Sequence, residues 1–110
     1  MDYKDYEQAA LKIYQNLGYR LIVKNYRKKG YEIDLLFQKQ DKIQIVEVKA
    51  SCLDSIEIIN KFAKSQYRFY KRFLSKIENS RLSTYNLSFE IIIFAKNTRK
   101  TLEFERYKIF

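Results

Sequence analysis

The chain has 110 residues, of which 46% are hydrophobic, and this is enough for a single domain over residues 1–110 with one buried core. It carries 22 Lys and Arg against 13 Asp and Glu, and the formal net charge of +9 favours a polyanionic partner, nucleic acid first. The absence of histidine excludes Ser-His and Cys-His catalysis and histidine-bound zinc, so any chemistry must use carboxylates, lysine, tyrosine or a metal.

Features that report on cellular location all favour a soluble cytoplasmic protein. The single Cys52 excludes an internal disulfide, which fits a reducing compartment. The N-terminus is charged from Asp2 onward and lacks the apolar segment of a signal peptide. The longest apolar run, Ile91–Ala95, is far shorter than the roughly 20 residues that span a bilayer. We therefore expect no membrane partner.

A helix is predicted at the start of the chain by apolar residues at three- and four-residue spacing, namely Tyr6, Ala9, Ala10, Ile13, Tyr14 and Leu17. Gly18 suits the position just past the helix end. Glu7 lies beside the apolar stripe, where its carboxylate could reach the water shell of a metal. An ordinary first-turn Glu, favoured by the helix dipole, is the alternative.

A strand is predicted over Tyr19–Lys24, followed by a basic loop over Asn25–Gly30. The cations of this region are Lys24, Arg27, Lys28 and Lys29. They form either an edge that binds phosphates or a solvated loop, and we favour the first interpretation.

The next two strands, Glu32–Phe37 and Ile43–Ala50, alternate at period two and are joined by a short polar linker, which is typical of a β-hairpin. A tight turn between Gln40 and Asp41 would set the register of the two arms. In that register Asp34 lies directly across from Glu47, with Cβ atoms about 5 Å apart.

Side chains two apart on a strand share a face, so Lys49 joins Glu47 and Asp34 in one patch. Two carboxylates this close repel each other unless a proton or cation lies between them, and Mg²⁺ or Mn²⁺ is the hard divalent ion that oxygen ligands suggest. An ordinary half-exposed strand without a metal site has the same local pattern. The sequence around the hairpin must therefore distinguish the two interpretations.

The longest helix is predicted over residues 56–79, with one apolar face and one cationic stripe that includes Lys64 and Arg68. Gln66 falls on the apolar face, where it is either a buried structural amide or a polar group directed at the sheet. Strands over Leu87–Ala95 and Thr101–Ile109 complete an α/β sandwich of order αβββαββ, a mixed sheet flanked by helices.

This order of elements is similar to the core of the PD-(D/E)XK nuclease superfamily, and in detail it resembles the YraN-type family of predicted endonucleases. The resemblance covers nearly the whole chain and rests on Glu7-Gln8-Ala9-Ala10, Gly18-Tyr19-Arg20-Leu21, Asn25-Tyr26-Arg27, Glu32-Ile33-Asp34-Leu35, Val46-Glu47-Val48-Lys49, Lys64-Ser65-Gln66-Tyr67-Arg68 and Phe89-Glu90-Ile91. It implies a restriction-endonuclease-like fold.

Carried over by position, the resemblance implies that Asp34 and Glu47 bind Mg²⁺ or Mn²⁺ directly, with the Val48 carbonyl as a third ligand. Lys49 would orient or activate the attacking water and offset charge on the phosphorus. Glu7 and Gln66 would support the site. The nucleic-acid-binding residues expected from the charge pattern are Lys24, Arg27, Lys28, Lys29, Lys64 and Arg68.

Two positions depart from the family pattern: Tyr31 replaces a glycine, and Ala50-Ser51 replaces Thr-Arg. Both lie near the expected phosphate path and leave the metal ligands in place. The expected function is a metal-dependent endonuclease acting on DNA, branched or processed DNA included. The alternatives are a nucleic-acid-binding module without turnover and a basic structural protein. The oligomeric state stays open, a homodimer included.

Overall fold

The computed structural model describes residues 2–28, 31–51, 57, 86–96 and 103–108. Its elements are helix α1 (Tyr3–Asn16) and strands β1 (Arg20–Lys28), β2 (Tyr31–Lys39), β3 (Lys42–Ser51), β4 (Asn86–Ala95) and β5 (Phe104–Lys108). The predicted helix over 56–79, with Lys64, Gln66 and Arg68, lies outside the described residues except for Glu57, and Lys29 and Cys52 lie outside them as well.

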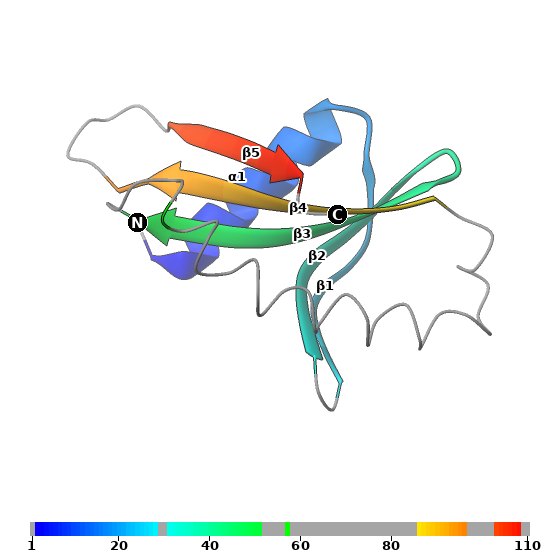
Figure 1. The fold of residues 1–110 in the computed structure, drawn as a ribbon, viewed down its shortest axis with the longest axis horizontal. Coiled ribbons are helices and arrows are strands. Elements are labelled where there is room, and N and C mark those ends of the chain that lie inside the picture. Colours follow the sequence, from blue (N-terminus) through cyan, green and yellow to red (C-terminus); the bar gives the residue numbers. More distant parts are fainter. Residues whose placement is uncertain (1, 29–30, 52–56, 58–85, 97–102, 109–110) are drawn as a thin grey trace.

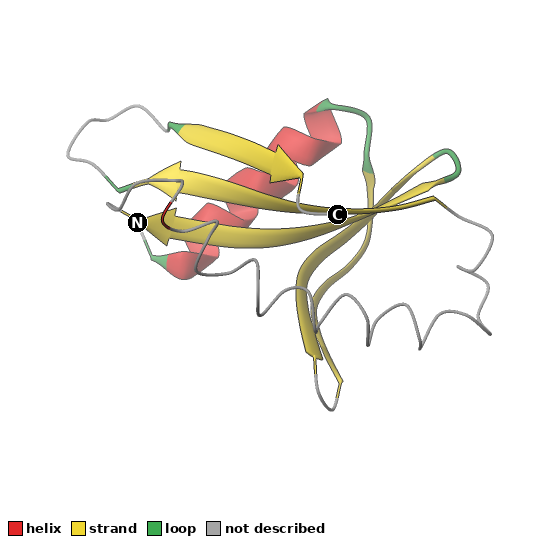
Figure 2. Cartoon of the chain, in the orientation of Figure 1, coloured by secondary structure: helices red, strands yellow, loops and turns green. Residues whose placement is uncertain are grey.

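The five strands form one sheet in the order β1-β2-β3-β4-β5. Every neighbouring pair is antiparallel except β3 and β4, which run parallel, so the prediction of a mixed sheet is confirmed. Helix α1 crosses one face of this sheet (Figure 2). In the part of the chain that the structure describes, no helix is long and apolar enough to cross a membrane.

Both ends of α1 are fixed by local hydrogen bonds. Asp2 and Asp5 form a capping box, which starts the helix three residues before the apolar stripe begins. At the other end, Gly18 takes the left-handed conformation with φ of 92°, the position predicted for it. The amides of Gly18 and Tyr19 donate to the carbonyls of Gln15 and Tyr14, the pattern of a Schellman motif.

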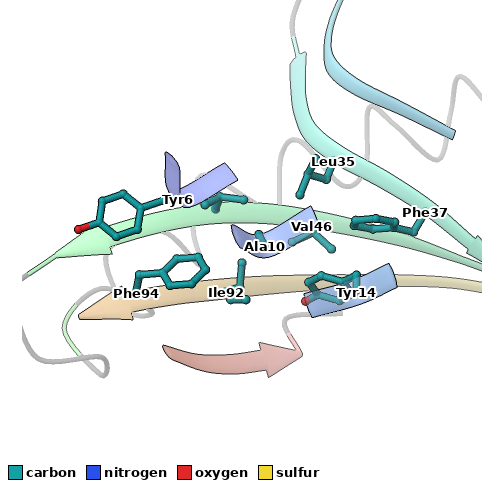
Figure 3. Packing of buried hydrophobic residues seen from close by; sticks show 9 residues of the cluster. Tyr6, Ala10, Tyr14, Leu35, Phe37, Val46, Ile92 and Phe94 are labelled. Carbon is teal, nitrogen blue, oxygen red and sulfur yellow. The ribbon is translucent and has the colours of Figure 1, made fainter. Parts of the chain in front are cut away.

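The core lies between α1 and the sheet (Figure 3), as the spacing of the helix predicts. Its members are Tyr6, Ala10, Tyr14, Leu35, Phe37, Val46, Val48, Ile92 and Phe94, all of them buried. Tyr14 stacks on Phe37 with ring centroids 4.9 Å apart, and Tyr6 contacts Phe94 at 5.4 Å. The Tyr6 contact holds the start of α1 over the end of β4, and the Tyr14 contact holds the end of the helix over β2.

Strand β1 is longer than predicted: it continues to Lys28, and Tyr26, Arg27 and Lys28 pair with β2, so residues 25–28 do not form the expected basic loop. Cross-strand pairing satisfies the main chain there and overrides the loop signal of a polar, cationic sequence. The strand is irregular: its register shifts between Leu21 and Val23, and Asn25 has a positive φ of 52°. Lys24 and Arg27 therefore extend from a strand, and Lys28 is its last residue.

A polar cluster joins α1 to the two C-terminal strands. The Glu90 carboxylate, with 10% of its side chain exposed, accepts hydrogen bonds from the Tyr14 hydroxyl at 2.8 Å and from Arg106 Nε at 3.0 Å. The Arg106 guanidinium also lies over the Tyr14 ring, 4.7 Å from its centroid. Removing one partner of such a pair leaves a charge without compensation.

We expect Arg106→Met to lower the free energy of unfolding by about 2 kcal/mol, because it leaves the Glu90 carboxylate poorly solvated. Urea denaturation measures this. The control is Arg27→Met, whose ion pair with Glu32 is long, at 3.8 Å, and exposed, so its effect should stay below about 0.5 kcal/mol. Equal effects of the two variants would contradict a structural role for the Glu90 cluster.

Candidate metal and catalytic site

The candidate site begins where β2 and β3 separate. The two strands pair from Lys39 and Lys42, beside a tight turn in which Gln40 has a φ of 55°, as far as Leu35 and Val46. The predicted turn and register are therefore confirmed. The pairing stops one step before Asp34 and Glu47, and β2 bends away from β3 (Figure 1). The prediction that Asp34 pairs directly with Glu47 is therefore wrong: the two are the first residues past the point of separation.

Where the ladder ends, the Asp34 carboxylate serves in place of a main-chain carbonyl as the hydrogen-bond acceptor for the Val48 N–H. Its Oδ2 atom accepts hydrogen bonds from the Val48 N–H and from the Tyr3 hydroxyl, both at 2.8 Å. The Tyr3 oxygen lies 3.3 Å from the Val48 carbonyl oxygen as well. The carboxylate is held firmly because its two donors come from two different elements, β3 and α1.

Glu47 and Lys49 lie on one face of β3, beside Asp34 of β2. Val46 and Val48 point into the core beneath α1, so the residues between and after them point to the opposite face. Lys49 Nζ is 3.1 Å from Glu47 Oε1, and the two side chains are 27% and 16% exposed. Burial and the neighbouring Asp34 raise the pKa of Glu47 to about 7, and the Lys49 ammonium opposes this. The surroundings of Glu47 therefore disfavour its charged form.

Glu7 reaches the same region from α1, as predicted. Asn25 lies between Lys24 and Tyr26, which pair with Leu35 and Ile33 on either side of Asp34, and with its amide nitrogen turned toward Glu7 it donates to both carboxylate oxygens, at 3.2 and 3.3 Å. Burial and the charge of Asp34 raise the pKa of Glu7, while hydrogen bonds from Asn25 and Tyr3 and the charge of Lys24 lower it. Hydrogen bonds to an ionised carboxylate are stronger than neutral ones, so two of them fix the orientation of the Glu7 side chain.

These side chains line one pocket of about 280 Å³, formed by Tyr3, Glu7, Asn25, Tyr26, Arg27, Glu32, Ile33, Asp34, Glu47 and Lys49. It brings together five predicted site residues: Glu7, Arg27, Asp34, Glu47 and Lys49. Val48 contributes its main chain through the bonds to Asp34 and Tyr3.

Tyr3 and Asn25 are site residues that the sequence analysis missed. Tyr3 lies four residues before Glu7 on the helix, a spacing that puts both side chains on one face. This signal was available, but Tyr3 precedes the predicted start of the helix. Asn25 carried no comparable signal, because its place beside Glu7 depends on the irregular course of β1.

The donor atoms suit a hard divalent cation. Asp34, Glu47 and the Val48 carbonyl offer only oxygen, and two carboxylates with remaining positions filled by water or phosphate are the usual surroundings of Mg²⁺. Within the described ranges no three Asp, Glu or Cys side chains converge on one point, so a full protein cage is absent there. The Tyr3 hydroxyl identifies one point that Asp34 and Val48 both face, at 2.8 and 3.3 Å. The residues present therefore fit Mg²⁺ or Mn²⁺.

The raised pKa of Glu47 gives the metal-free protein a characteristic pH dependence. The pKa of Glu47 is about 7 in the folded protein, whereas that of an ordinary glutamate carboxyl is about 4.5, so folding takes up a proton between these pH values. We expect the free energy of unfolding, measured with chelator, to fall by about 2–3 kcal/mol between pH 4.5 and pH 7.5 as this contribution is lost.

Glu47→Gln removes the titrating group and should flatten that decline. Glu103→Gln, a change at an exposed carboxylate before β5, serves as the matched control and should keep the parent profile. If parent and Glu47→Gln lose the same stability over this pH range, Glu47 does not titrate as the pocket geometry requires.

The fold and the pocket define the class of this protein. It is an α/β domain with a mixed sheet, and its candidate site consists of carboxylates and a lysine where β2 and β3 separate. Residues 6–94 match the sequence model of a family described as "Uncharacterised protein family UPF0102". The chain belongs to this family, which is the endonuclease-like YraN-type family. The matched residues include Glu7, Asp34, Glu47 and Lys49 but not Tyr3.

Individual relatives agree with the family assignment. A UPF0102 protein of Syntrophus aciditrophicus is 32% identical over 88 residues, which make up 78% of this chain and 69% of the relative. A UPF0102 protein of Sulfurihydrogenibium is 30% identical over 98 residues, covering 86% and 84% of the two chains. One from Acinetobacter baylyi is 41% identical over 54 residues, but these are only 49% of this chain and 39% of the relative.

Proposed function

We propose that the protein is a metal-dependent endonuclease that hydrolyses phosphodiester bonds in DNA, branched or processed DNA included, and that its domain is of the PD-(D/E)XK, restriction-endonuclease-like type. The observation that carries the proposal is the meeting of Asp34, Glu47, Lys49 and the Val48 main chain where β2 and β3 separate. The pocket is polar, and the absence of histidine from the sequence excludes a histidine-dependent phosphodiesterase mechanism.

Each residue has a defined task in this proposal. Asp34 and Glu47 would hold Mg²⁺ or Mn²⁺, with the Val48 carbonyl as a third oxygen ligand. The ion would supply Lewis-acid polarisation of the phosphodiester and a means of lowering the pKa of water. Lys49 cannot ligate a cation while it is protonated, so it would orient the attacking water and offset the negative charge that develops on the phosphorus.

Glu7 and Asn25 would act beside these ligands. Asn25 fixes the Glu7 carboxylate by donating to both of its oxygens, so the carboxylate faces the pocket in one orientation. From there it would accept hydrogen bonds from water at the site. Gln66, the other supporting residue that the family resemblance implies, stays a prediction.

The cations near the pocket favour a nucleic-acid substrate. Arg27 lines the pocket, and the charge of Lys24 is close enough to lower the pKa of Glu7. Both side chains are exposed on β1 and can contact phosphates on either side of the scissile bond. Such contacts position the strand without reading bases, which fits an enzyme that recognises DNA shape.

A nucleic-acid-binding module without turnover is the second candidate. It is favoured by the absence of a three-carboxylate cluster among the described residues and by the Tyr3 hydroxyl on two of the three proposed ligands. This candidate keeps the basic charge and the DNA contacts but needs no ion.

The experiment that separates the two candidates is a cleavage assay on plasmid, single-stranded, flapped and four-way DNA. The endonuclease proposal expects products with Mn²⁺ or Mg²⁺ and none with chelator. Binding to the same DNA without any cleavage in either condition would favour the module and refute the enzyme.

A further inference from the structure

One hydroxyl group lies between two of the proposed cation ligands. Tyr3 is in the first turn of α1, directly after the Asp2 cap, and its side chain reaches Asp34 Oδ2 at 2.8 Å and the Val48 carbonyl oxygen at 3.3 Å. A phenol has a single proton, so it cannot fully satisfy both acceptors at once. Two oxygen acceptors thus converge on one shared donor.

A divalent cation bound by these same two oxygens would need nearly the same place. Mg²⁺ and Mn²⁺ lie only about 2.1–2.2 Å from their oxygen ligands. A hydroxyl that donates a proton to those ligands takes up their lone pairs and the space between them. Tyr3 and the cation therefore compete for Asp34 and Val48.

The Tyr3 side chain is free to leave. It is 47% exposed, and its hydroxyl contacts Asp34 and Val48 and also lies close enough to the Glu7 carboxylate to lower the pKa of that group. The helix itself stays capped through Asp2 and Asp5 and packed through Tyr6, none of which depends on the Tyr3 hydroxyl. A change of side-chain rotamer would release the hydroxyl to water without disturbing the fold.

We propose that Tyr3 is a positioning residue that closes the cation position in the metal-free protein and is displaced from Asp34 and Val48 when Mg²⁺ or Mn²⁺ binds. This inference rests on the proposed function, since it takes Asp34 and Val48 as cation ligands. Tyr3 keeps the Asp34 carboxylate in its bonded orientation until the ion arrives. It also sets how tightly the ion binds, because each binding event must break the hydrogen bond that the Tyr3 hydroxyl shares between these two acceptors.

The test is the affinity of the full chain for Mn²⁺, measured from the electron paramagnetic resonance signal of free Mn²⁺. Tyr3→Phe should bind Mn²⁺ about five- to tenfold more tightly than the parent, the equivalent of one hydrogen bond no longer lost on binding. Tyr3→Leu should change the affinity in the same direction. Tyr19→Phe is the control: its hydroxyl accepts from Lys42 outside the pocket, and its affinity should stay within about twofold of the parent.

The outcomes separate this inference from the proposed function. Weaker binding by Tyr3→Phe would overturn the inference and make Tyr3 a support for Asp34, and unchanged binding would overturn it as well. The proposed metal site is judged separately: it is supported if the parent binds Mn²⁺ and Asp34→Asn does not, whether Tyr3→Phe binds more weakly or equally well. Binding by Tyr3→Phe but not by the parent would support a closed position, whereas no binding by either would remove the metal site and the inference together.

Discussion

Lys49→Ala should lower the rate of DNA cleavage by about 100-fold or more while Mn²⁺ binding persists. The Lys49 ammonium is 3.1 Å from Glu47 Oε1 and lines the pocket, so it is close enough to act on water or phosphate there. Its removal takes away a positive charge next to the cation position, which should leave Mn²⁺ affinity equal or slightly higher. The loss would then lie in the chemical step.

Single-turnover cleavage and Mn²⁺ titration of the same samples measure the two effects separately. Lys12→Ala, a change at an exposed lysine on α1, is the control for lost charge alone and should cleave within about twofold of the parent. Parent-like cleavage by Lys49→Ala would show that this lysine is only a surface cation paired with Glu47, and the mechanistic assignment would fail.

Asp34→Asn should abolish the stabilisation that Mn²⁺ gives to the folded protein. For the parent, Mn²⁺ at 100 times its dissociation constant should add about 2.7 kcal/mol to the free energy of unfolding. The variant keeps an oxygen that can accept from the Val48 N–H but loses the charge that attracts the ion and repels Glu47. With chelator we therefore expect its stability to equal that of the parent or exceed it slightly.

Asp34→Ala is the matched variant, because it removes the acceptor as well as the charge. It should lose about 1–3 kcal/mol with chelator, the cost of leaving the Val48 N–H without a partner. Melting curves with chelator and with Mn²⁺ measure both variants. A Mn²⁺ shift in Asp34→Asn as large as that of the parent would exclude Asp34 as a ligand.

The hairpin at the centre of the fold was predictable because its information is local. Period-two alternation set the faces of β2 and β3, and the polar linker set the tight turn at Gln40, so the register followed. The apolar spacing of α1 and the position of Gly18 were predictable for the same reason.

The point at which β2 leaves β3 was not predictable from sequence. It depends on α1 reaching Asp34 through Tyr3 and on the Asp34 side chain replacing a main-chain partner of Val48. These contacts join residues far apart in the chain, and no local pattern records them. A flat hairpin with Asp34 facing Glu47 was the natural expectation without them.

The extension of β1 was missed for a related reason. The segment after Lys24 is cationic and polar, which is typical of a loop, yet pairing with β2 keeps it in the sheet through Lys28. This pairing is also what places Asn25 beside Glu7 and Arg27 at the pocket. The pocket therefore contains residues that the sequence analysis proposed, but the contacts that hold them in place were not predicted.

The location of Mn²⁺ in crystals grown or soaked with the ion tests the central claim most directly. Anomalous scattering should give one strong peak within coordination distance of the Asp34 and Glu47 carboxylates and the Val48 carbonyl, with the Tyr3 hydroxyl moved away. A peak at other carboxylates, or a pocket without any peak while Tyr3 still contacts Asp34, would contradict the assignment of this pocket as the metal site of a nuclease.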